Sequence, residues 1–562
     1  MEFQKLVTPF ENNTDAWTKI YPRPQLKRDS WLSLCGEWEL YTADKEEFIG
    51  KIKVPFPPES RLSGIGHSVG ESYAYKKSFT LPEGFKCGRV HIHFGAVDCI
   101  GNVKINGKEA GCHEGGYVPF SLDITHLLSE NENTVEVVVT DKTDADYCYG
   151  KQAKNRGGMW YTPISGIWQP VWLESTAENY IKELKITANQ SKVTIETLGG
   201  EAEKKIVLNG TEYCYMGDTF TLDIDNGILW SPENPHLYTF TLISGEDKVE
   251  SYFALRSIEC KNGYIYLNSK PCYFHGVLDQ GYYPGGIFAP GSPYGYEYDI
   301  TLMKALGFNT LRKHVKIEPD IFYYYCDKIG MIVFQDMVNS GEYRYVRDTV
   351  LPTVGFKKKR DRQASEKRKL HFEKTLTEMT NLLYNHPSVC LYTIFNEGWG
   401  QHNAESLYKK MKEKDPSRIW NTASGWFKTK MSDVDSEHVY FKKVNLTQKG
   451  EKPLLLTEFG GYSCKIEEHS FNLEKTYGYK KFTDCNAFCD ALESLYKNEV
   501  VPSVEKGLSG SILTQLSDVE DETNGLVTYD RQVAKVDPER MLEIKQMLKS
   551  AFERGIMSTT RK

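Results

Sequence analysis

The feature that most restricts the fold is an apolar run, residues 389–395, that ends on Asn396 and Glu397. An apolar run without polar alternation is typical of a strand buried on both faces, as in a parallel sheet. A second such run, residues 454–457, ends on Glu458 and is followed by glycines. The carboxyl ends of barrel strands meet at one face, so we expect both glutamates to share one site.

The chain after about residue 259 alternates strand-like with helix-like segments, which indicates a parallel sheet. We predict strands at 273–278, 309–314, 331–337, 389–396, 419–424, 437–440, 454–459 and 511–516. We predict helices at 298–306, 320–328, 366–384, 404–414, 486–497 and 541–553. Eight strands in about 300 residues is the count of a (β/α)8 TIM barrel.

Polar side chains lie at the predicted carboxyl ends of these strands. They are Asp279, Gln280, His314, Asp336, Glu397, Ser424, His438, Tyr440, Glu458, Asp518 and Glu520. A single one could be a helix cap or a solvated loop residue, but their recurrence predicts a site at this face of the barrel. Two glutamates that face one sugar from both sides are what glycoside hydrolysis needs.

The first half of the chain has a different pattern. Residues 30–175 alternate apolar and polar positions between turn signals such as Asn106-Gly107, which predicts a jelly-roll β-sandwich. Short strands at close spacing over 180–258 predict a smaller immunoglobulin-like sandwich. We therefore expect a multidomain β plus α/β chain with domains at 1–178, 179–258 and 259–562.

Composition restricts the partners. The chain has 562 residues, a net charge of −7 and a pI near 6.1, which argues against nucleic acid or anionic lipid as a partner. There is no signal-peptide pattern and no apolar run of about 18 residues, so we expect no membrane span and a cytoplasmic location. The 13 scattered cysteines indicate reduced thiols. No phosphate loop or nucleophile-elbow motif is present, and we expect no cofactor. The sequence leaves open whether the chain forms a homo-oligomer.

Several motifs, in this order, resemble glycoside hydrolase family 2, the β-galactosidase and β-glucuronidase family. Residues 21–24, 94–98, 113–117 and 165–168 are similar to its sugar-binding sandwich, and residues 229–238 are similar to its middle domain. Phe395-Asn396-Glu397-Gly398 resembles its acid/base signature, and Thr457-Glu458-Phe459-Gly460 resembles its nucleophile signature. The resemblance covers nearly all of the chain.

The resemblance implies a role for each residue. Glu397 would be the acid/base, Glu458 the nucleophile, and Asn396 a partner of the sugar 2-hydroxyl. Tyr440 would lie against the nucleophile. The resemblance also implies that Arg312 and His314 line the pocket floor and that Asp279 and Gln280 contact substrate. Asp336, His438, Asp518 and Glu520 join these as substrate-binding candidates because of their strand-tip positions.

The chain departs from the family pattern at three places. Gly157-Gly158 precede Met159-Trp160 where metal-dependent relatives carry an Asp, so we expect no metal. Residues 513–516 lack the tryptophan that many relatives have at the last strand tip; Trp399 or Trp426 could replace it, or could serve packing. The Asn-x-Lys pair of the β-glucuronidases is absent at Asn524-Gly525-Leu526.

The expected activity is that of a retaining, metal-independent exo-β-glycosidase acting on terminal neutral sugars, galactose first. An unpaired buried carboxylate is costly, and the strand tips are mostly acidic, so we expect a uronic acid to be a poor substrate. Arg312, His314, Lys313 or Lys316 could still supply a cation for one. A uronic acid, an arabinofuranoside, and a non-catalytic carbohydrate-binding role stay as alternatives.

Overall fold

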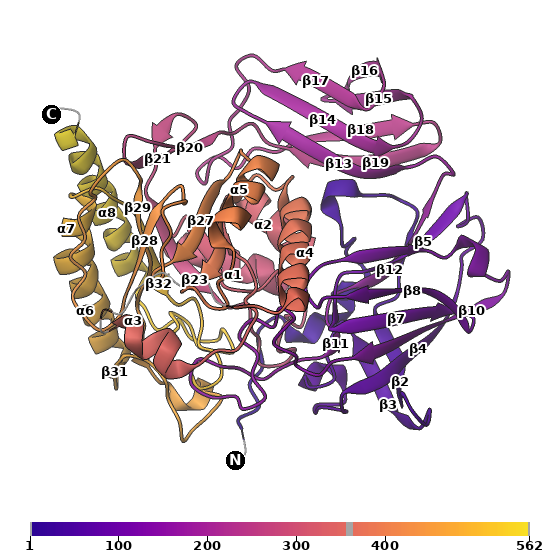
Figure 1. The fold of residues 1–562 in the computed structure, drawn as a ribbon, viewed down its shortest axis with the longest axis horizontal. Coiled ribbons are helices and arrows are strands. Elements are labelled where there is room, and N and C mark those ends of the chain that lie inside the picture. Colours follow the sequence, from indigo (N-terminus) through magenta and orange to yellow (C-terminus); the bar gives the residue numbers. More distant parts are fainter. Residues whose placement is uncertain (1–2, 354, 356–362, 560–562) are drawn as a thin grey trace.

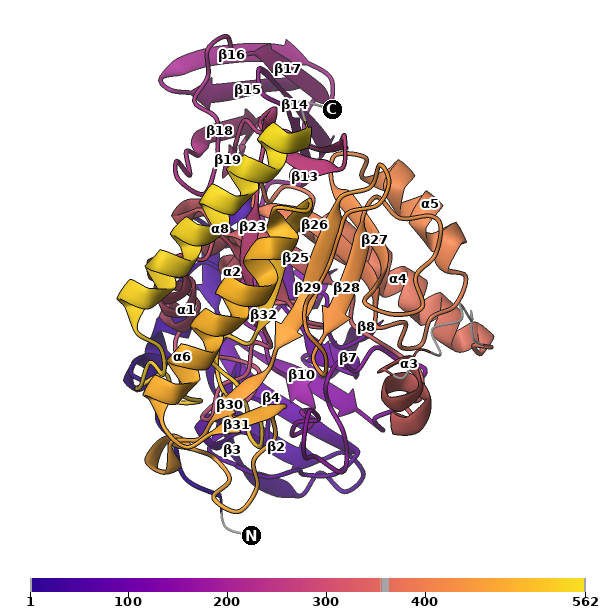
Figure 2. The ribbon, with the colours of Figure 1, turned by 90° about the vertical axis from the view of Figure 1, so that its left-hand side faces the viewer.

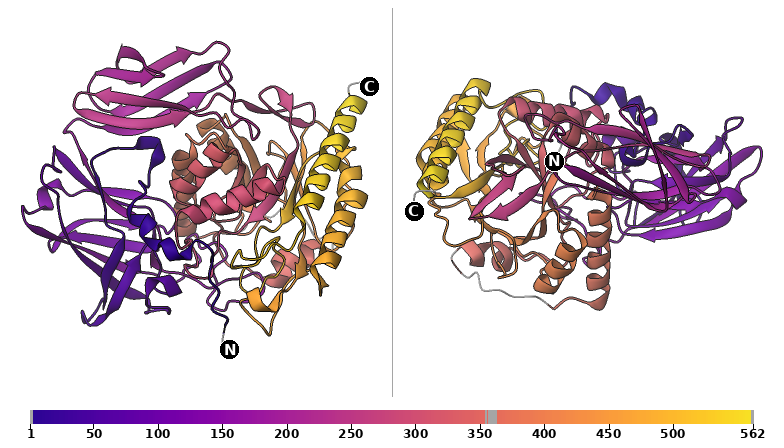
Figure 3. Two further views of the ribbon diagram at one scale, coloured as in Figure 1. Left: turned by 180° about the vertical axis from the view of Figure 1, so that it is seen from behind. Right: turned by 90° about the horizontal axis from the view of Figure 1, so that it is seen from above.

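The structure is a computed structural model that describes residues 3–353, 355 and 363–559. It consists of two β-sandwiches and a parallel barrel (Figure 1), so the predicted fold class is confirmed. The second sandwich lies above the other two units in Figures 1 and 2. The first sandwich and the C-terminal helix lie on opposite sides of the barrel (Figure 3). The domain bounds predicted from the sequence stay a prediction.

The first sandwich packs a four-stranded sheet on a six-stranded sheet. The four-stranded sheet has the order β1 (Trp31–Ser33), β12 (Val171–Thr176), β5 (Arg89–Phe94), β9 (Phe120–Asp123). The six-stranded sheet has the order β3 (Phe48–Val54), β2 (Gly36–Thr42), β4 (Ser72–Thr80), β10 (Glu132–Thr140), β7 (Ile100–Ile105), β8 (Lys108–Glu114). Alternation buries one face of each strand, as in β10, where Val135, Val137 and Val139 enter the core between the sheets.

The second sandwich is smaller. One sheet contains β13 (Ile181–Ala188), β14 (Lys192–Gly199) and β17 (Thr219–Asp223). The other contains β16 (Thr211–Met216), β15 (Glu203–Leu208), β18 (Tyr238–Ser244) and β19 (Asp247–Phe253). Short strands complete the β structure: β6 (Val97–Asp98), β11 (Gly166–Ile167), β20 (Ile258–Lys261), β21 (Tyr264–Leu267), β22 (Lys270–Pro271), β30 (Tyr462–Cys464) and β31 (Lys480–Phe482).

All eight predicted barrel strands occur, and every residue in them except two in β28 is buried. They are β23 (Phe274–Asp279), β24 (Thr310–Lys313), β25 (Ile332–Asp336), β26 (Val389–Asn396), β27 (Ile419–Ser424), β28 (Asp435–Val439), β29 (Leu454–Gly460) and β32 (Leu508–Thr514). The sheet order is β27-β26-β25-β24-β23-β32-β29-β28. Between β27 and β28 side chains help to close the ring, because Asn421 Nδ2 donates to Ser436 Oγ at 3.2 Å.

Helices surround the barrel: α1 (Tyr294–Ala305), α2 (Asp320–Ile329), α3 (Leu351–Thr353), α4 (Glu366–Leu383), α5 (Ala404–Lys414), α6 (Cys485–Leu495), α7 (Val501–Val504) and α8 (Pro538–Thr559). Local signals fix several ends. Asp484 caps α6 by accepting from Asn486 N at 2.8 Å, and Gly330, at φ +83°, ends α2. Among the described helices none is long and apolar enough to cross a membrane.

A loop of the first sandwich, between β10 and β11, reaches the mouth of the barrel. Tyr149 N donates to Asn339 O at 3.0 Å, which anchors the loop on the segment after β25. Gly150 adopts φ +67°, and a Cβ there would lie 2.9 Å from Val315 O, so glycine allows the close approach. The next residue, Lys151, is thereby placed beside the barrel site.

Candidate active site

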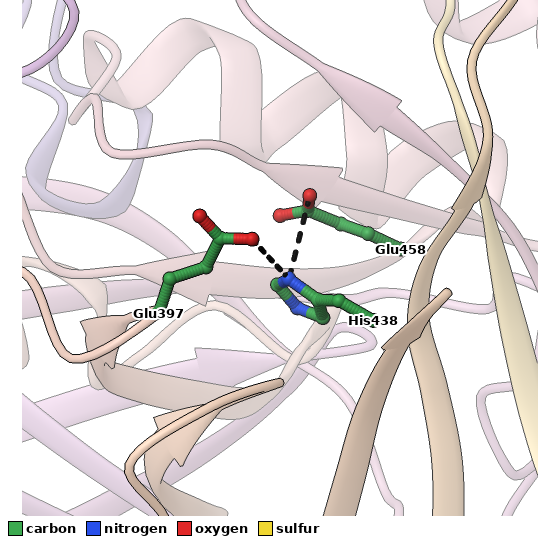
Figure 4. Close-up of side chains that lie close together, drawn as sticks. All are labelled: Glu397, His438 and Glu458. Atoms are coloured by element: carbon green, nitrogen blue, oxygen red, sulfur yellow. Dashed lines mark hydrogen bonds and ion pairs between the residues drawn. The ribbon is translucent and has the colours of Figure 1, made fainter. Parts of the chain in front are cut away.

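Glu397 and Glu458 meet at the carboxyl-terminal mouth of the barrel. Glu458 lies near the end of β29, and Glu397 follows β26 directly in the left-handed region, at φ +50°. One oxygen of each carboxylate and Nδ1 of His438 all lie within 4.8 Å of one another (Figure 4). Both glutamates are buried. The glutamates that follow the two apolar runs of the sequence therefore lie side by side.

Donors surround Glu458 and keep it ionised. Arg312 Nη1 donates to Oε1 at 2.9 Å, and Tyr440 Oη donates to Oε2 at 2.6 Å. Burial alone would raise the pKa of Glu458, but the charges of His438 and Arg312 and the Tyr440 hydrogen bond outweigh burial and hold the pKa well below its usual range. A carboxylate that stays ionised can act as a nucleophile.

Glu397 has the opposite electrostatic environment. Burial raises its pKa above the usual range, His438 opposes the rise through a contact of 2.8 Å between Nδ1 and Oε1, and the negative charge of Glu458 adds to it. The net direction is upward, so Glu397 holds its proton to higher pH than an exposed glutamate. Two carboxyl groups whose environments move their pKa values apart match an acid and a nucleophile.

Arg312 holds the floor of the site together. Its guanidinium is 1% exposed, and its Nε donates to Asp336 Oδ1 at 3.0 Å. Its Nη2 donates to Asn396 Oδ1 at 2.9 Å. Asp336 in turn contacts His314, with Oδ2 2.9 Å from Nδ1. From β24, this one arginine thereby bonds residues at the ends of β25, β26, β27 and β29.

A cavity opens above this floor. Its lining comprises Lys151, Met159, Leu278, Gln280, His314, Thr349, Asn396, Glu397, Trp399, Trp426, Tyr440, Glu458, Tyr479, Thr514, Glu522 and Asn524. Eight of the residues singled out from the sequence belong to it: Gln280, His314, Asn396, Glu397, Trp399, Trp426, Tyr440 and Glu458. Arg312, Asp336 and His438 lie directly behind them and bond to lining residues.

Three predicted substrate contacts are engaged elsewhere. Asp279 pairs with Lys313 at 2.6 Å, and Asp518 pairs with Lys535 at 2.6 Å. Glu520 accepts from Thr162 N at 3.0 Å and faces Arg156 at 3.3 Å. None of the three belongs to the lining of the catalytic cavity. Each balances a buried cation or backbone group, which is the reason an acid occurs at these strand ends.

The structure adds polar lining residues that were not among the predicted site residues: Lys151, Thr349, Tyr479, Thr514, Glu522 and Asn524. Glu522 belongs to the same acidic run as Asp518 and Glu520, so the polar residues after the last predicted strand could have indicated it. Lys151 lies in the sandwich loop, and no local pattern links it to the barrel. Only the contact between the two domains reveals it.

Glu397, His438 and Glu458 offer three ligand atoms close enough to hold a metal ion. Both oxygens of Glu458 already accept hydrogen bonds, from Arg312 and Tyr440, and the guanidinium would repel a cation. The donor set therefore fits a hydrogen-bonded pair of carboxyl groups better than a metal centre. The expectation of no metal stays a prediction.

Three family models match the chain in order. "Glycosyl hydrolases family 2, sugar binding domain" matches residues 10–176, "Glycosyl hydrolases family 2" matches 172–256, and "Glycosyl hydrolases family 2, TIM barrel domain" matches 258–549. A β-galactosidase of Priestia megaterium is 24% identical over 517 residues, which cover 81% of this chain and 47% of the relative. The chain thus spans about half the length of the curated relatives it matches.

Solved structures share the fold. A β-D-glucuronidase of Dictyoglomus thermophilum superimposes with a TM-score of 0.75 at 19% identity, covering 94% of this chain and 98% of that one. A β-galacturonidase of Eisenbergiella tayi gives a TM-score of 0.68 at 18% identity, with coverages of 94% and 98%. From the three consecutive domain matches, the chain belongs to glycoside hydrolase family 2.

Proposed function

We propose that the protein is a retaining exo-β-glycosidase. The observation that carries this proposal is the approach of a Glu397 oxygen to within 4.8 Å of a Glu458 oxygen. Retaining enzymes hold their two carboxyl groups about 5–5.5 Å apart, whereas inverting enzymes need about 6.5–9.5 Å to admit a water molecule. The spacing therefore favours double displacement.

In this mechanism each glutamate has one role at a time. Glu458 attacks the anomeric carbon while Glu397 donates its proton to the departing oxygen. Forming the ester removes the negative charge of Glu458, which had helped to raise the pKa of Glu397. That pKa then falls, so Glu397 can accept a proton from the water that cleaves the ester. Arg312 and Ser424 both donate to Oδ1 of Asn396, and in this mechanism Asn396 would bond the 2-hydroxyl.

The floor of the cavity supports action on a terminal sugar. Arg312 and Asp336, at most 1% exposed, close the barrel beneath the two glutamates, so a chain cannot pass through. The sugar was expected from the sequence to be neutral and galactose-like. The relatives are named for galactose, glucuronic acid and galacturonic acid. A specific observation, the buried Lys151 in the lining of the cavity, favours an acidic sugar.

Hydrolysis of a panel of nitrophenyl β-glycosides tests the proposal. We expect at least one glycoside to be cleaved by the wild type and none at a comparable rate by Glu458→Ala. If no glycoside is cleaved, the alternative of a non-catalytic carbohydrate-binding protein takes its place, and binding of free sugars would then decide it.

A further inference from the structure

Lys151 brings an ammonium group into the catalytic cavity. The residue is 6% exposed, lines the cavity with both glutamates, and holds Nζ 4.8 Å from the centre of the Trp399 ring. In the part of the chain that the structure describes, this Nζ makes no hydrogen bond and no ion pair within 4.0 Å. Its contacts are the faces of Trp399 and Trp160, and a buried ammonium without a hydrogen-bond or ionic partner is costly, so the position requires a reason.

Three carboxylates near Lys151, those of Glu522, Glu458 and Glu397, lie beyond ion-pair distance of its Nζ and bond to other groups. Glu522 Oε2 accepts from Tyr161 Oη at 2.5 Å and from Gln515 Nε2 at 2.9 Å. Both oxygens of Glu458 accept from Arg312 and Tyr440. These carboxylates favour the charged form of Lys151 from a distance, although burial lowers its pKa overall. A ligand oxygen would give the ammonium the direct partner that the protein does not provide.

Two further donors line the same cavity without an acceptor. Trp399 Nε1 and Asn524 Nδ2 are buried and have no hydrogen-bond partner among the described residues. Only one neutral side-chain acceptor of the lining is in the same condition, Gln280 Oε1. A sugar hydroxyl both donates and accepts, whereas a carboxylate only accepts, at up to about four positions. Unpaired donors that include a cation match a carboxylate.

The rigidity of the loop supports a binding role. Tyr149 and Gly150 fix the preceding backbone against the barrel, and Gln152 Nε2 donates to Tyr117 Oη at 3.0 Å. Nζ of Lys151 lies 4.8 Å from the centre of the Trp399 ring and 5.8 Å from that of Trp160, and these two rings stack on each other at 5.6 Å. The ammonium is therefore held in place before a ligand arrives, and pre-organisation of this kind reduces the cost of binding.

We propose that Lys151 binds the carboxylate of an acidic terminal sugar, so that the substrate class is β-linked uronides rather than neutral glycosides. This inference rests on the proposed function of the same cavity. It replaces the neutral sugar expected from the strand tips, because the cation comes from the sandwich loop and not from the barrel. Glucuronides and galacturonides share the recognised group, and the test separates them.

The test compares kcat/KM for nitrophenyl β-glucuronide, β-galacturonide, β-galactoside and β-glucoside. We expect the wild type to cleave one uronide at least about tenfold faster than either neutral glycoside, the ratio that 1.4 kcal/mol of preference provides. Lys151→Met keeps an apolar side chain of similar length and removes the charge. It should lower the uronide value about 100-fold, as loss of a buried charge pair does, and change the neutral values by less than about fivefold.

Lys154→Met, an exposed lysine of the same loop, is the matched control and should leave all four values unchanged. Titration of free D-glucuronate, D-galacturonate and D-galactose by calorimetry gives a second readout that needs no turnover, and unchanged melting temperatures show that the variants fold. Faster cleavage of a neutral glycoside by the wild type, or an equal loss on all substrates in Lys151→Met, overturns the inference. Either result is still compatible with the proposed glycosidase activity. If no glycoside is cleaved, both the proposed activity and the inference about Lys151 are contradicted.

Discussion

His438 Nδ1 lies 2.8 Å from Glu397 Oε1 and 3.5 Å from Glu458 Oε2, so one imidazole contacts both carboxyl groups (Figure 4). The ring is buried and is supported on its other nitrogen by Arg312 Nη1 at 3.3 Å. This contact opposes the rise in the pKa of Glu397 and contributes to the depression of the pKa of Glu458. We therefore expect a change at His438 to affect both limbs of the pH profile of activity.

Replacing His438 by Asn should move the whole pH profile of kcat/KM to higher pH. Loss of the imidazole raises the pKa of Glu458, so the acidic limb rises, and raises the pKa of Glu397, so the basic limb rises as well. The exposed His67→Asn is the control. Limbs that stay at the wild-type positions in His438→Asn would show that the contact has no electrostatic effect.

Tyr440→Phe should lower kcat by about 10- to 100-fold, because a hydrogen bond to a charged group contributes about 1.5–3 kcal/mol. The bond at 2.6 Å stabilises ionised Glu458. Without it the pKa of Glu458 rises, and the acidic limb of kcat/KM should shift to higher pH while the basic limb stays. Initial rates measured across pH check both statements. A shift of the basic limb alone would assign Tyr440 to the acid instead.

The two glutamates should respond differently to the leaving group. Glu458→Ala should lower kcat/KM at least about 1,000-fold on every substrate, because it removes the nucleophile. Glu397→Ala should show its smallest loss of kcat/KM with a nitrophenyl leaving group, because this group needs little protonation. With azide, Glu458→Ala should give the α-glycosyl azide and Glu397→Ala the β-glycosyl azide. The same dependence on leaving group in both variants would mean that the roles are wrongly assigned.

Arg28 should be a stability determinant between the two sandwiches. Its Nη2 pairs with Asp247 at 2.9 Å and its Nη1 with Glu174 at 3.2 Å, and all three side chains are buried. Arg28→Met leaves two buried carboxylates without this partner. It should lower the free energy of unfolding, measured by urea denaturation, by about 3–5 kcal/mol. Lys27→Met breaks the exposed pair with Glu250 and should cost at most about 1 kcal/mol. Similar costs for the two would contradict this ranking.

The barrel and its two glutamates could be predicted because their signals are local. Runs such as residues 389–395 are apolar throughout, and a strand that ends on Glu397 carries that side chain to the mouth of the barrel. The strand ends were less accurate: the last strand is Leu508–Thr514 rather than 511–516. The chain there continues the sheet through Leu508 and Ser509 and turns away after Thr514.

The remainder of the site depends on contacts between distant segments. Lys151 reaches the cavity because Tyr149 and Gly150 lie against the barrel, and the sequence around it gives no sign of that contact. Asp279 and Asp518 looked like substrate contacts, but Lys313 and Lys535 neutralise them in the interior. Counting acids at strand tips therefore overstated the negative character of the cavity and missed its cation.

The stereochemistry of hydrolysis tests the central claim most directly. Proton NMR of the first product formed from a cleaved nitrophenyl β-glycoside reports its anomeric configuration before mutarotation. Because the carboxylate oxygens of Glu397 and Glu458 approach within 4.8 Å, the account predicts the β-anomer first, and a 2-deoxy-2-fluoro glycoside should label Glu458. Release of the α-anomer first would show that water attacks directly and would contradict the double displacement.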